Sequence, residues 1–119
     1  MSDNKTRRAL NSGERRALEQ YARLEIPLDE LVERLNQVAE FRLGPTERRI
    51  DVHYERPEPP IQITPWHIEN VQARKKRGDI SEHEVAEWAS MLLLIDAYDW
   101  EGPNEDVIAE WLNDLALLT

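Results

Sequence analysis

Cysteine is missing from all 119 positions of the sequence. A chain without thiols cannot form disulfides, thiolate zinc sites or a cysteine nucleophile. Glycine is also scarce, and its four copies lie too far apart to build a phosphate-binding loop. No serine stands in the context of a nucleophile elbow. Because no catalytic motif is legible, the sequence predicts a non-enzymatic protein that uses no cofactor.

Long apolar runs are missing too. The longest, at residues 91–95, is far shorter than the roughly 20 apolar residues that a membrane-spanning helix needs. The N-terminus, Met-Ser-Asp-Asn-Lys-Thr-Arg-Arg, lacks the apolar region of a secretory signal. We therefore expect a cytoplasmic protein with no membrane partner. The lack of cysteine fits a reducing compartment.

Basic side chains are missing after Arg77, where 11 acidic residues follow. Residues 1–56 balance 11 basic against 11 acidic side chains, whereas residues 57–119 hold 4 and 13 and account for the net charge of −9. Such a field repels nucleic acid and anionic lipid, and it attracts basic proteins. The charge pattern predicts a basic protein partner and argues against nucleic-acid binding.

The length of the chain predicts a single domain over residues 1–119. A domain of this size can bury a working core without disulfides or metals, and four tryptophans supply bulky side chains for that core. Residues 1–6 show no hydrophobic periodicity, so we expect them to be disordered.

The spacing of apolar residues predicts a mainly α fold with a minor β ribbon. Helices are expected over residues 12–24, 27–40, 65–77, 81–97 and 104–117. Between them, Ile50, Val52 and Tyr54 alternate with polar residues, which is the two-residue period of a strand. A second short strand at 61–63 would complete a ribbon at about 48–63. The expected architecture is two helical hairpins plus a C-terminal helix, packed around the central apolar helix at 81–97.

Capping residues define the starts of these helices. Asn11 with Glu14, and Ser81 with Glu84, have the spacing of capping boxes. Asn104 is expected to cap the last helix.

Residues 23–33 also line up with residues 77–87, at an offset of 54 positions. Both stretches read as helix, tight turn, acid, Ile, cap and helix. This similarity is explained either by a duplication or by shared capping chemistry.

The second stretch lies in a segment, residues 63–97, that resembles helical hairpins of small bacterial proteins. It is also similar to helical pieces of immunity proteins of bacterial toxin systems. The resemblance depends on Gly78-Asp79-Ile80-Ser81, Glu84 and Glu87-Trp88-Ala89. These residues mostly serve capping, so the resemblance implies a helical hairpin and transfers no functional residue.

The leading hypothesis for function is an acidic interaction module, immunity- or antitoxin-like, that binds a basic partner by charge steering. The expected partner-binding residues are Glu82, Glu84, Glu87, Asp99, Glu101, Glu105 and Asp106. The ribbon at 48–63 would offer a second contact by strand addition.

Two alternatives stay open. The first is a small metal- or ligand-binding protein that uses His67, His83 and Glu87, because His83 and Glu87 share a helix face. The second is a structural homodimer held by surplus apolar surface at residues 88–95 and around Trp100 and Trp111.

Overall fold

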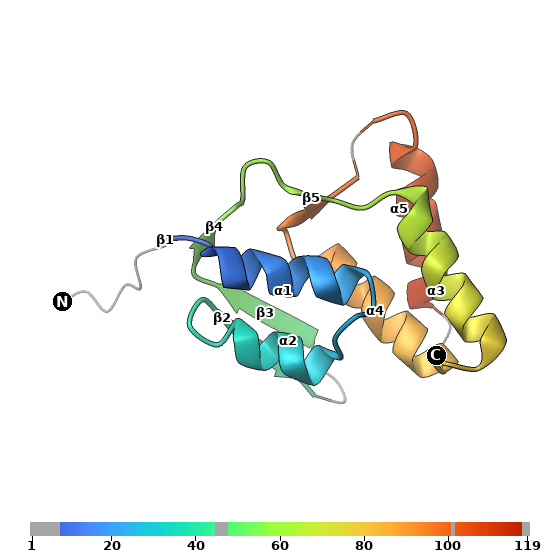
Figure 1. Ribbon diagram of the computed structural model, residues 1–119, viewed down its shortest axis with the longest axis horizontal. Helices are drawn as coiled ribbons and strands as arrows, with labels where there is room; N and C mark the ends of the chain where they lie inside the picture. Colours follow the sequence, from blue (N-terminus) through green and yellow to red (C-terminus); the bar gives the residue numbers. More distant parts are fainter. Residues whose placement is uncertain (1–7, 45–47, 101, 118–119) are drawn as a thin grey trace.

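The computed structural model describes residues 8–44, 48–100 and 102–117 (Figure 1). The disorder expected at residues 1–6 lies outside this range. The helices are α1 Ser12–Ala22, α2 Leu28–Arg34, α3 Pro65–Arg77, α4 Glu82–Leu94 and α5 Glu105–Ala116. The strands are β1 Arg8–Ala9, β2 Ala39–Leu43, β3 Arg48–Val52, β4 Tyr54–Glu55, β5 Ile61–Gln62 and β6 Tyr98–Asp99. The prediction of a mainly α fold with a small β component is confirmed.

The two predicted capping boxes are confirmed. The side chain of Asn11 accepts the N–H of Glu14 at 2.8 Å, and the Glu14 carboxylate accepts the N–H of Asn11 at 3.0 Å. Ser81 and Glu84 make the same reciprocal pair at 3.1 and 3.0 Å. Asn104 precedes α5 as expected, but its side chain makes no capping hydrogen bond.

The two turns related by the 54-residue offset fold alike. α1 ends before Leu24, which has a φ of 61°, and α3 ends before Gly78, which has a φ of 83°. In each turn the next N–H donates to a carbonyl five residues back, from Glu25 at 2.8 Å and from Asp79 at 2.9 Å. This is the Schellman arrangement, which needs one left-handed residue. Glycine meets that need without strain, whereas a leucine does not.

The helix expected over 27–40 is wrong in its second half. α2 ends at Arg34, and residues 39–43 form strand β2. Leu35 and Val38 are buried, as the helical spacing predicted, but both residues lie in turns and not in a helix. The physical reason is the alternation that begins at Ala39, because a strand there can pair with β3.

The ribbon expected at 48–63 is also wrong in its pairing. β3 pairs antiparallel with β2, with Phe41 opposite Ile50. β4 pairs in parallel with β1, and β5 pairs in parallel with β6. Prolines at 57, 59 and 60 separate β4 from β5, so these two strands find partners far away in the chain.

The core gathers around α1, α4 and α5. Six residues of α4 are buried, namely Val85, Ala86, Trp88, Ala89, Met91 and Leu92. The Trp88 indole N–H donates to the Ala22 carbonyl of α1 at 3.3 Å, and α5 packs against α4. α4 ends at Leu94, not at 97 as expected. α1 also contacts α2, and α3 contacts α4. The arrangement of two hairpins around a central helix stays a prediction.

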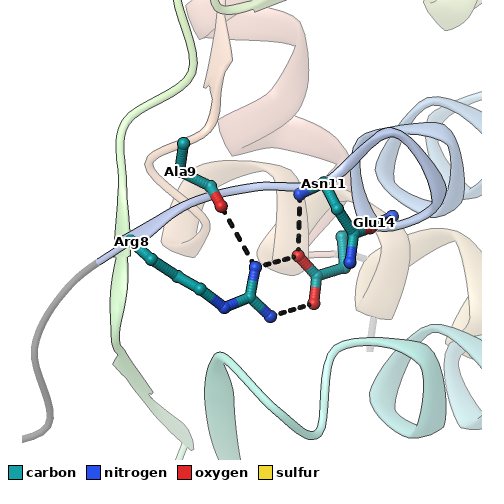
Figure 2. Close-up of polar contacts among 4 residues, drawn as sticks. All are labelled: Arg8, Ala9, Asn11 and Glu14. Carbon is teal, nitrogen blue, oxygen red and sulfur yellow. Dashed lines mark hydrogen bonds and ion pairs between the residues drawn. The ribbon is translucent and has the colours of Figure 1, made fainter.

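Glu14 is the one charged residue buried among those the structure describes, with 5% of its surface exposed. Its carboxylate accepts two hydrogen bonds from Arg8, at 2.9 and 2.7 Å (Figure 2). The Arg8 hydrogen bonds lower the pKa of Glu14, and the same contact raises the pKa of Arg8. The pair therefore ties β1 to the start of α1.

Within the described residues, no helix is both long and apolar enough to cross a membrane.

Candidate functional site

The end of α4 builds the frame of the candidate site. Ile95, with φ −85° and ψ 114°, is extended, so the chain leaves the helix after Leu94. β6 then pairs with β5, and the N–H of Ile61 donates to the Ala97 carbonyl at 2.9 Å. The chain next returns as α5, which packs along α4. Residues 95–100 therefore connect α4 to α5, and they are fixed by the pairing of β6 with β5.

Tyr98 anchors this frame. Its hydroxyl donates a hydrogen bond of 2.6 Å to the Leu18 carbonyl of α1. The residue is 3% exposed, and burial raises the pKa of its hydroxyl well above the ordinary value of 10.0. A tyrosine in this environment stays protonated and serves packing, not proton transfer.

A hollow of about 560 Å³ opens beside the frame. Its lining combines four carboxylates, one guanidinium, two aromatic side chains and an aliphatic set. The lining residues are Arg56, Leu92, Leu93, Ile95, Asp96, Tyr98, Asp99, Trp100, Glu105, Asp106 and Ala109. We call this feature the acidic hollow.

Asp99 is the most engaged of the four carboxylates. One oxygen accepts the N–H of Trp100 at 2.8 Å, and the other lies 3.5 Å from a guanidinium nitrogen of Arg56. Its side chain is only 16% exposed, so it is fixed by its neighbours. Asp99 therefore positions Trp100 and Arg56 more than it offers charge to solvent.

The other three carboxylates are more exposed. Asp96 accepts the Tyr54 hydroxyl at 3.1 Å, while its backbone carbonyl accepts the Arg56 Nε–H at 2.9 Å. Glu105 and Asp106 lie in the first turn of α5. The positive end of a helix dipole stabilises acids at that place.

The chemistry of the acidic hollow suits a cation on an organic stem. Carboxylates in excess over the single guanidinium attract an ammonium or guanidinium group and accept its hydrogen bonds. Trp100 adds an aromatic surface for the stem or for a cation–π contact. The ionisable side chains of the lining are the four carboxylates, Arg56 and the buried Tyr98.

The seven acids expected to bind a partner fall into two groups. The group that lines the acidic hollow is Asp99, Glu105 and Asp106. The group in the first half of α4 is Glu82, Glu84 and Glu87. α4 has 13 residues, so its two ends lie about 20 Å apart. Glu101 lies outside the described residues.

The acids on α4 make other contacts within the molecule. Glu84 caps its helix, as described above. Glu84 and Glu87 also line a smaller hollow of about 220 Å³ beneath the turn before α2, together with Asp29 and Trp88. The structure therefore does not join all the predicted acids into one face.

The metal-site alternative is not assembled in the described part of the chain. His67 lies in the first turn of α3, where its Nδ1 accepts the N–H of Thr64 at 3.0 Å. His83 and Glu87 line a different hollow, of about 420 Å³, that His67 does not reach. No group of three His, Asp or Glu side chains in the described residues could hold a metal ion.

The apolar surface expected to hold a homodimer is mostly used inside the molecule. Trp88, Met91 and Leu92 are buried, and Trp100 and Trp111 pack against the core while partly exposed. Leu94 is the large exposed apolar residue of α4, at 43%.

The partner-binding set derived from the sequence omitted Arg56 and Asp96. Arg56 lies 40 residues from Asp96 along the chain, and it reaches the site through a contact that local patterns do not encode. Asp96 follows the apolar helix directly, and an acid at a helix end could have drawn attention to it.

Comparison with known proteins identifies no relative: no family model, no curated protein and no solved structure matches this chain.

Proposed function

We propose that the protein is a non-catalytic interaction module, immunity- or antitoxin-like, that binds a basic protein partner through the acidic hollow. The observation that supports this most is the lining itself, which holds four carboxylates and a single arginine. The net charge of −9 adds a long-range field that speeds encounter with a basic surface.

The hollow has the size and chemistry for one anchoring side chain. A lysine or arginine stem would pack against Trp100 and Leu93, and its charged end would meet Asp96, Glu105 and Asp106. The predicted acids on α4 lie in the first half of that helix, with Glu82 at the end farthest from the acidic hollow, and they would then contact a different part of the partner or none. Contacts at an exposed rim mainly set the association rate and its salt dependence.

The test is capture from host lysate with matched variants. The hollow variant carries Glu105→Gln and Asp106→Asn, and the control variant carries Glu110→Gln and Asp114→Asn in the same helix. Both variants lose two negative charges, and both use nearly isosteric side chains. We expect the wild type and the control to retain the same basic protein at low salt, and the hollow variant to bind it about two- to thirtyfold more weakly, since two exposed ion pairs at roughly 0.2–1 kcal/mol each sum to about 0.4–2 kcal/mol.

Two outcomes would count against the proposal. If both variants lose the partner equally, only net charge matters and the hollow is not the site. If the wild type retains no specific protein at low or moderate salt, the interaction module itself is wrong.

A further inference from the structure

The outer edge of β2 has no strand partner among the described residues. β2 reads Ala39-Glu40-Phe41-Arg42-Leu43, so its side chains alternate between two faces. Phe41 and Leu43 pack against the core, and the side chains of Glu40 and Arg42 are 48% and 54% exposed. The strand thus combines an apolar inner face, a charged outer face and an unpaired edge.

The pairing of β2 with β3 determines which residues of β2 direct their backbone N–H and C=O groups toward the unpaired edge. The N–H of His53 donates to the Val38 carbonyl at 2.6 Å, just beyond the end of the β2–β3 ladder. Hydrogen-bonded pairs alternate with non-hydrogen-bonded ones along an antiparallel ladder. The backbone N–H and C=O of Phe41 therefore point away from β3, toward the unpaired edge.

The charges of β2 are arranged symmetrically about Phe41, with an acid before it and a base after it. We propose that β2 pairs antiparallel with β2 of a second copy of this chain, with Phe41 opposite Phe41 of the partner. This register places Glu40 of each copy opposite Arg42 of the other, twice. The Phe41 backbone groups, which point outward, would exchange two hydrogen bonds with their counterparts.

The charges of the hairpin are compatible with such pairing. Within one copy, Glu40 lies opposite Asp51 and Arg42 lies opposite Arg49, and ion pairs on the same face offset these like charges, with Arg42 3.6 Å from Asp51 and 4.0 Å from Glu40. In the dimer, the acidic pair Glu40 and Asp51 of one copy lies beside the basic pair Arg42 and Arg49 of the other copy. The product is a four-stranded antiparallel sheet, and a sheet of three or more strands is more stable than a two-stranded hairpin alone.

The other edge of the hairpin is a poorer choice. β3 runs on into β4, and β1 lies along that side, where the N–H of Arg8 donates to the His53 carbonyl at 3.4 Å. The edge of β2 carries no such neighbour in the described residues, so it is the edge that a second copy can reach.

Charge exchange between two single variants tests the register. We expect the wild type to have twice the monomer mass by sedimentation equilibrium, at about 0.15 M salt so that the repulsion between two acidic chains is screened. Glu40→Arg alone and Arg42→Glu alone should each be monomeric, because like charges then meet across the interface. An equimolar mixture of the two should recover the double mass, and so should the double variant with both changes.

Controls separate this result from misfolding and from net charge. Glu33→Arg and Arg34→Glu make the same charge changes on exposed residues of α2, and both should remain dimeric. Circular dichroism should show the same helical content in all variants. A monomer mass for the wild type at every soluble concentration overturns the proposal. So does a dimer that both single variants preserve, or a mixture that stays monomeric.

Discussion

α1 and α3 are bounded by the same local devices, yet they occupy different depths in the molecule. α1 begins at the reciprocal cap of Asn11 and Glu14, and α3 begins at Thr64, whose N–H donates to His67 Nδ1 at 3.0 Å. Each helix ends in a left-handed turn, and the two turns lie 54 residues apart. α1 buries Glu14, Ala17, Leu18, Tyr21 and Ala22, whereas α3 buries only Ile68 and Val71. Capping and turn residues therefore decide where a helix starts and stops. The apolar content of its face decides how deeply it packs.

The helices that follow the turns repeat this contrast. α2 has 7 residues and α4 has 13, and α4 carries the central tryptophan, Trp88. Each of the following experiments changes one residue in one helix or turn and compares the effect with that of a similar change elsewhere in the molecule.

The largest effect is expected from Trp88→Ala in α4. Trp88 is 1% exposed, and its indole donates to Ala22, so the change leaves a cavity and an unpaired carbonyl. Large-to-small changes of this kind cost about 3–5 kcal/mol of unfolding free energy. The matched change in α3, Trp66→Ala, removes a residue that is 52% exposed and should cost less than about 1 kcal/mol. Urea denaturation measures both, and equal costs would refute the difference in depth.

The next effect is expected at the cap of α1. Glu14→Ala removes the carboxylate that accepts both the Asn11 N–H and the Arg8 guanidinium. The loss of a capping contact and a charged hydrogen bond should cost about 2 kcal/mol. Glu84→Ala in α4 removes a capping carboxylate that accepts no hydrogen bond from an arginine of the described residues, so it should cost about 1 kcal/mol. Thermal unfolding of the two variants checks the order, and a greater loss at Glu84 would contradict it.

A smaller effect is expected at the two turns. Gly78→Ala puts a Cβ on a left-handed residue, with nothing within 4 Å of it, so backbone strain alone should cost about 1 kcal/mol. Leu24→Gly relieves the same strain but removes a side chain packed against the core, and the two effects should nearly cancel. Urea midpoints measure both. A Gly78→Ala variant as stable as the wild type would mean that the turn can relax.

The smallest effect is a difference in pH dependence between the caps. Burial and the positive charge of Arg23 lower the pKa of His67 from 6.5. The contribution of His67 to the free energy of unfolding is therefore complete above pH 6.5 and is lost as the pH falls below 6.5. Arg8 lowers the pKa of Glu14 from 4.5, so the contribution of Glu14 to the free energy of unfolding is lost only below pH 4.5. His67→Gln keeps an N3 acceptor that does not titrate. Between pH 7.5 and 5.5 the wild type should lose stability relative to this variant, and parallel curves would show that His67 does not titrate in folding.

Local signals in the sequence carried much of the fold. Asn11 and Ser81 predicted helix starts that the structure confirms, because a cap depends only on residues within the first turn of the helix. The apolar spacing through Leu35 and Val38 predicted burial correctly but assigned the wrong element. A three-residue spacing of apolar positions fits a helix as well as a turn that leads into a strand.

Pairing between distant segments could not be predicted. β5 joins β6, 37 residues later, and nothing in Ile61 or Tyr98 alone specifies the other. The acidic hollow depends on this pairing, because it brings Arg56 to Asp96 and Asp99. The sequence therefore located three of the acids in this hollow, but it could not separate them from the acids at the other end of α4.

Two hydrogen bonds to α1 also have a consequence for synthesis of the chain. The carbonyls of Ala22 and Leu18 receive their donors from residues 66 and 80 positions later. During translation, the first helical unit emerges from the ribosome with its buried face uncovered until α4 and β6 have followed. Contacts at such separation slow folding and expose apolar surface in the meantime. A ribosome stalled before Tyr98 should therefore display an N-terminal half that proteases cut readily, and release of the full chain should end that sensitivity.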